Sequence, residues 1–171
     1  MTRVSAAFGR LLDALAGAAA LLLLAMVVVV CADILLRNIT GAGVSWANEA
    51  SEYALYVMTL LTAPWLLRRG QHVRLDIMLT LLPPRLAWLM EAFGDMLGFA
   101  VSLVLVRYGL AMTFDSARIG AITIKNLVFP EWWLLAPLPA AFILLAIEFI
   151  FRFQRLLVGE RTPRIEATSV S

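Results

Sequence analysis

Apolar residues in this chain gather into long blocks, and the polar positions lie mostly between the blocks. The hydrocarbon core of a bilayer requires about 20 consecutive, mainly apolar residues in a helix. Blocks over residues 11–36, 86–113 and 132–151 reach that length. A further block, 46–67, has a clean apolar part of only fourteen residues, so a span there brings Glu49 and Glu52 to the membrane edge. The pattern therefore predicts four membrane spans. Each span is expected to be helical, because unpaired backbone groups are not tolerated in lipid.

The segment between the second and third blocks, residues 68–85, reads RRGQHVRLDIMLTLLPPR. It is too apolar for a free loop and too short to span, so we predict a segment lying in the membrane interface. A hydrogen bond between His72 and Asp76, one helical turn apart, fits such a segment. The four helices and this connector form one domain over residues 1–156, followed by a polar tail over 157–171. Pro137 and Pro139 are expected to bend or loosen the start of the fourth helix.

Composition supports a membrane protein, since 62% of the residues are hydrophobic and 15% are charged. Soluble domains are about 45–50% apolar and about 25% charged. The basic residues form no patch with interleaved aromatics, which argues against nucleic-acid binding. The single cysteine excludes an internal disulfide and a cysteine-based zinc site. The first block is longer than the apolar region of a signal peptide, and no A-x-A site follows it, so it is interpreted as a span.

The basic residues are distributed unevenly between the two sides of a four-span chain. Ten of the fourteen fall on the side that holds both termini and the 68–85 connector. The positive-inside rule therefore predicts that both termini are cytoplasmic. The five tryptophans fall at the ends of the predicted spans, where aromatic belts lie.

Carboxylates inside the spans are the most informative residues. Each costs about 2.5–3.5 kcal/mol at the centre of a membrane helix, and less near its ends. Glu49 and Glu52 share a helix face that Tyr53 and Tyr56 extend. Three interpretations compete: the carboxylates are solvated or paired with arginine, they contact another membrane subunit, or they carry protons or a cation. Arg68, Arg85 and Arg107 are the arginines considered as partners.

The third predicted span carries a second pair of carboxylates, Glu91 and Asp95, four residues apart on one face. Gly94 and Gly98 beside them form a small-xxx-small pair, which allows close helix contact in membranes. No G-x-S-x-G, H-E-x-x-H or histidine cluster is present, so we predict no catalytic, cofactor or metal site. Transport by this chain alone is disfavoured, because no inverted repeat or pair of broken helices is evident.

Several stretches occur in a characteristic order from Arg10 to Arg152. They are DILLRNITG, WANEASEYALYVMTLLTAPWLLRRGQH, GQHVRLDIM, TLLPPR and PEWWLLAPLP. In this order the chain resembles the small, DctQ-like membrane subunit of tripartite ATP-independent periplasmic (TRAP) transporters. The alternative is a stand-alone four-span membrane protein, either structural or an enzyme of unrecorded type.

The resemblance implies an all-α subunit of the bacterial inner membrane that braces a large membrane permease subunit. That larger subunit would hold the substrate and sodium sites, and a periplasmic binding protein would deliver an organic anion, often a carboxylate. The outer loops, 37–45 and 115–131, are candidate contacts for the binding protein. Candidate residues for the interface with the large subunit are Trp46, Glu49, Glu52, Tyr53, Tyr56, Glu91, Gly94, Asp95 and Gly98. Candidate residues for fixing the turn after the second span are Gly70, His72, Arg74 and Asp76.

Overall fold

The structure is a computed structural model that describes residues 3–69 and 83–158. Its helices are α1 (Arg3–Thr40), α2 (Ala47–Arg68), α4 (Pro84–Ile119), α5 (Trp132–Leu135) and α6 (Pro137–Val158), with strands β1 (Ile122–Ile124) and β2 (Val128–Pro130) between α4 and α5. The predicted turn residues Gly70, His72, Arg74 and Asp76 lie outside the described residues. Most of the predicted connector and of the polar tail also lies outside them.

Three segments of the described chain are long and apolar enough to cross a membrane: Ser5–Thr40, Trp88–Ile119 and Trp132–Leu156. They correspond to the first, third and fourth predicted spans. Helix α2 occupies the range predicted for the second span and has 22 residues, yet it is less apolar than these three segments and is not among them. Glu49, Glu52 and the terminal Arg68 lower its apolar character. The structure therefore supports three spans, and a crossing by α2 stays a prediction.

The long helices extend beyond the apolar blocks that predicted them. Helix α1 has 38 residues and α4 has 36. At 1.5 Å per residue these lengths are about 57 Å and about 54 Å, against a hydrocarbon core of about 30 Å. A helix ends where its hydrogen-bond ladder is interrupted, not where its side chains become polar, so these helices continue beyond the apolar blocks. Gly120, with φ of 67°, provides that interruption for α4.

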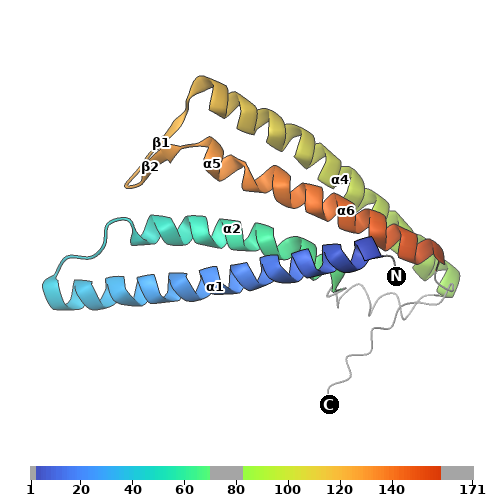
Figure 1. Cartoon of the computed structure of the whole chain (residues 1–171), viewed down its shortest axis with the longest axis horizontal. Helices are drawn as coiled ribbons and strands as arrows, with labels where there is room; N and C mark the ends of the chain where they lie inside the picture. Colours follow the sequence, from blue (N-terminus) through green and yellow to red (C-terminus); the bar gives the residue numbers. More distant parts are fainter. Residues whose placement is uncertain (1–2, 70–82, 159–171) are drawn as a thin grey trace, which may run out of the picture.

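The helices form two antiparallel hairpins, α1 with α2 and α4 with α6, as Figure 1 shows. Contacts between α2 and α6 join the two hairpins. The first described residues of α1 and the last of α6 lie at one end of the molecule, called here the terminal end (Figure 1). There the rings of Phe8 and Phe151 have centroids 5.6 Å apart. The α1–α2 loop and the strands lie at the opposite end, called here the hairpin end.

At the hairpin end, β1 and β2 pair antiparallel, with Ile122 opposite Pro130 and Ile124 opposite Val128. This β-hairpin lies in a segment that the sequence analysis took as a loop. The chain then enters α5, and Ala136 separates α5 from α6, which begins at Pro137. This break confirms that the prolines disturb the start of the predicted fourth helix. Proline has no N–H to donate, so it is best tolerated in the first turn of a helix.

Among the described residues, few apolar side chains are buried between the helices, and these are mostly alanines and leucines such as Ala19 and Leu12. Large apolar side chains point outwards instead, for example Leu21, Phe93 and Met96. Such a surface is unusual for a soluble monomer and is expected where lipid or another membrane chain covers the helices.

Candidate functional site

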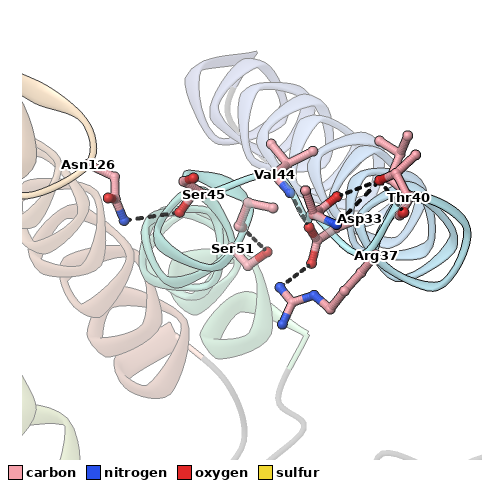
Figure 2. A network of polar contacts seen from close by, with 10 residues as sticks. Asp33, Arg37, Thr40, Val44, Ser45, Ser51 and Asn126 are labelled. Atoms are coloured by element: carbon pink, nitrogen blue, oxygen red, sulfur yellow. Dashed lines mark hydrogen bonds and ion pairs between the residues drawn. The ribbon is translucent and has the colours of Figure 1, made fainter.

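Glu49 is the centre of the polar contacts between α2 and the β-hairpin. Only 5% of the residue is exposed. Its carboxylate accepts a hydrogen bond from the Tyr53 hydroxyl at 2.7 Å and one from the Leu127 backbone N–H at 3.1 Å. Nearby, the Asn126 side chain donates to the Ser45 carbonyl at 3.0 Å (Figure 2). Glu49 therefore helps to attach the β-hairpin to the start of α2.

Glu52 and Tyr53 also face the β-hairpin. The Glu52 carboxylate lies 3.5 Å from the Lys125 ammonium, and both side chains are more than half exposed. The same ammonium lies 5.7 Å from the centre of the Tyr53 ring, and the Phe129 ring meets Tyr53 edge-on with centroids 5.3 Å apart. Three of the predicted interface residues, Glu49, Glu52 and Tyr53, thus come together in contacts within the chain. Trp46 remains exposed at the start of α2, and Tyr56 is partly buried one turn beyond Glu52.

Asp33, which the sequence analysis did not single out, organises the loop between α1 and α2. It is 5% exposed and accepts a hydrogen bond from the Val44 backbone N–H at 2.5 Å. It also pairs with Arg37 at 3.0 Å, as Figure 2 shows. A Cβ added to Gly43 would lie 2.7 Å from the Asp33 carboxylate, so this close approach requires glycine. The sequence signal that could have identified Asp33 is its position four residues before an arginine at the end of an apolar helix.

At the terminal end, Glu148 of α6 is completely buried. Arg68 of α2 lies 3.1 Å from one carboxylate oxygen, and Arg155 of α6 contacts the other. Arg68 also donates to the Ser5 carbonyl of α1 at 2.8 Å. The set of Arg68, Glu148 and Arg155, called here the Glu148 cluster, therefore connects α1, α2 and α6. A Cβ on Gly9 would lie 2.9 Å from the Arg68 guanidinium, so α1 passes close to this cluster.

The predicted pair Glu91 and Asp95 lies between α4 and α6. Arg152 of α6 lies 2.8 Å from Asp95 and 3.5 Å from Glu91. Asp95 is buried, and the Glu91 side chain is 12% exposed. The pairing agrees with the interpretation that these carboxylates meet an arginine, although Arg152 was not among the partners considered.

The two glycines of the small-xxx-small pair have different surroundings. A Cβ on Gly98 would lie 2.3 Å from the Phe149 ring, so this glycine allows α4 and α6 to pack closely within the chain. A Cβ on Gly94 would meet nothing within 4 Å. Gly94 thus leaves open space on the outer surface of α4.

In this arrangement, buried carboxylates form ion pairs with arginine side chains. At the terminal end, the carboxylates of Glu148, Glu91 and Asp95 are matched by three arginines, Arg68, Arg155 and Arg152. Within residues 3–69 and 83–158, no group of three or more His, Cys, Asp or Glu residues could hold a metal ion. The carboxylates connect helices, and the outward surface is apolar. These features define a small helical membrane protein.

Comparison with known families identifies the family to which this membrane protein belongs. The family model of the DctQ component of tripartite ATP-independent periplasmic transporters matches residues 26–159. The chain belongs to this family of transporter components. It is also 24% identical over 129 residues to the sialic acid TRAP transporter permease protein SiaT of Haemophilus influenzae (strain 86-028NP). That alignment covers 75% of this chain and 20% of the relative, so the chain spans about a fifth of the relative's length.

Proposed function

We propose that this chain is the small permease subunit of a sodium-driven tripartite transporter for organic anions, and that it braces the large permease subunit. A periplasmic binding protein delivers the substrate to that larger subunit. The chain lies in the bacterial inner membrane with α2 as a fourth span and both termini in the cytoplasm. Residues 1–156 act as one membrane domain.

The observation that carries the bracing role is the attachment of the two helical hairpins at both ends. At the hairpin end, the Glu49 carboxylate accepts from the Leu127 N–H. At the terminal end, Arg68 of α2 pairs with Glu148 of α6. In lipid, helix association depends on packing and on interhelical hydrogen bonds rather than on the hydrophobic effect. Polar contacts at both ends therefore favour one fixed arrangement, which suits a subunit that stays still while its partner moves.

The substrate class rests on the family and on the relative. SiaT is named for sialic acid, which is a carboxylic acid, and most of its length lies outside the region that matches this chain. We assign the substrate and sodium sites to the large subunit for that reason. The small chain then needs no ion-binding pocket of its own.

For the interface with the large subunit, we propose that the outward members of the predicted set make the contacts. These are Trp46, Glu52 and Gly94, which are exposed. Glu49, Tyr53, Glu91, Asp95 and Gly98 would act indirectly, because their contacts within the chain shape that surface. Tyr56, partly buried on α2, lies between these two groups.

Co-purification with the large subunit tests the interface. Gly94→Leu fills the open space on α4 without a clash inside the chain, so we expect it to lower recovery of the large subunit several-fold. Ala100→Leu, on another exposed face of the same helix, is the matched control and should leave recovery unchanged. Equal recovery with both variants would refute the placement of Gly94 at the interface.

The transport role requires a separate measurement. Proteoliposomes with both membrane subunits and the binding protein should accumulate an organic acid when a sodium gradient is imposed. Omitting this chain should abolish uptake, while the binding protein alone should still bind the substrate. Uptake by the large subunit and binding protein without this chain would refute the proposed function.

A further inference from the structure

A groove between α1 and α2 is not used by any contact described above. It has a volume of about 570 Å³. Most residues of its α1 wall are small, including Ala16, Gly17 and Ala20, and Met58 and Thr62 form part of its α2 wall. A Cβ on Gly17 would meet nothing within 4 Å, so no side chain of the described residues fills the groove at that level.

The groove ends at a group of polar side chains on the terminal end. The Trp65 indole N–H donates to Asp13 at 2.9 Å. The Arg69 guanidinium lies 3.6 Å from the same carboxylate and 4.4 Å from the centre of the Trp65 ring. The side chains of Asp13 and Arg69 are 60% and 56% exposed, so each can reach a further charged group.

We propose that this groove binds one phospholipid with a zwitterionic, amine-bearing headgroup such as phosphatidylethanolamine. One acyl chain would lie along the small residues of α1, and the headgroup would lie at Asp13 and Arg69. Trp65 marks the level of the interface, since tryptophan is enriched there in membrane proteins. The inference rests on the proposed placement of α2 in the bilayer, and it goes beyond the proposed function because it assigns a lipid to this chain.

Charge complementarity selects this headgroup. A zwitterionic headgroup presents a phosphate and an ammonium group close together, and Arg69 and Asp13 present the two opposite charges at 3.6 Å. An anionic headgroup such as phosphatidylglycerol has a phosphate for Arg69 but no cation for Asp13, so the nearby carboxylate repels it. The pair of side chains therefore distinguishes between two lipids that fill the groove equally well.

Lipid retention by the purified full-length chain tests the proposal. The chain is reconstituted in nanodiscs with equal amounts of phosphatidylethanolamine and phosphatidylglycerol, extracted in mild detergent, and analysed by native mass spectrometry. We expect at least five-fold more bound phosphatidylethanolamine than phosphatidylglycerol. Ala20→Phe places a ring in the groove and should lower bound phosphatidylethanolamine at least five-fold. Ala18→Phe is the matched control, since Ala18 is exposed on the same turn but outside the groove.

The headgroup contact is tested independently with Asp13→Asn, which leaves Arg69 without its neighbouring carboxylate and should shift retention towards phosphatidylglycerol. Equal retention of the two lipids by the unmodified chain, or no effect of Ala20→Phe, would overturn the proposal. The measurement is repeated on the complex with the large subunit. If assembly removes the lipid, or if Ala20→Phe but not Ala18→Phe weakens assembly, a helix of the partner occupies the groove and the proposal is wrong.

Discussion

Replacing Glu148 by glutamine tests whether the Glu148 cluster stabilises the arrangement of the two helical hairpins. The substitution keeps the size of the side chain and removes its charge. Arg68 and Arg155 then lose their shared counter-charge in a place where Glu148 itself was completely buried. Removing one partner of a buried ion pair costs about 3–5 kcal/mol.

The structure points to the lower end of that range. The side chains of Arg68 and Arg155 are 18% and 31% exposed, so water can hydrate them in part when the carboxylate is lost. We therefore expect a loss of about 3 kcal/mol in the free energy of unfolding. That loss corresponds to a change of about 100-fold in the unfolding equilibrium constant.

Titration with SDS in mixed micelles, followed by circular dichroism, measures this free energy for the full chain. Glu52→Gln is the control variant, because both side chains of the Glu52–Lys125 ion pair are more than half exposed. An exposed pair contributes about 0–1 kcal/mol, so this variant should unfold almost like the unmodified chain. If Glu148→Gln and Glu52→Gln were equally mild, the cluster could not be what joins α2 to α6.

Three further predictions concern other parts of the chain. Gly98→Ala should destabilise the fold by about 1–3 kcal/mol because its Cβ would overlap the Phe149 ring, whereas Gly94→Ala should be neutral or stabilising in the same SDS titration. Asp33→Ala should raise the hydrogen-exchange rate of the Val44 amide about ten-fold or more, because that N–H loses its acceptor, and an unchanged rate would contradict the role of Asp33. Glu49→Leu should likewise raise exchange at the Leu127 amide, and protection retained there would show that the β-hairpin is attached by other contacts.

The sequence was sufficient to predict where the main helices lie, because apolar blocks of membrane length leave few alternatives. It was less informative about where they end. The polar ends of α1 continue the same hydrogen-bond ladder, so Arg3 and Thr40 are helical although they lie outside the apolar block. Similarly, the strands of the β-hairpin have three residues each, too few for an alternating pattern to be recognised.

The partners of the buried carboxylates were harder to predict from the sequence than the carboxylates themselves. Spacing placed Glu91 and Asp95 on one face, and the structure brings that face to Arg152. Arg152 is their partner because of the way α4 packs against α6. The periodicity of each helix alone does not predict that packing. Glu148 illustrates the same limit, since its partners come from α2 and from two turns further along α6.

A variant that replaces the whole Glu148 cluster distinguishes stability from specificity. The triple variant leaves no buried charge unpaired; its substitutions are Arg68→Met, Glu148→Leu and Arg155→Met. Apolar replacements of a buried ionic triad are often neutral or stabilising. We expect its free energy of unfolding to return to within about 1 kcal/mol of the unmodified chain. Assembly with the large subunit should nevertheless fall, because the variant loses the interhelical hydrogen bonds that help to hold α2 in one arrangement against α6 in lipid. Full recovery of both stability and assembly would show that packing alone sets the arrangement and that the charges are dispensable for bracing.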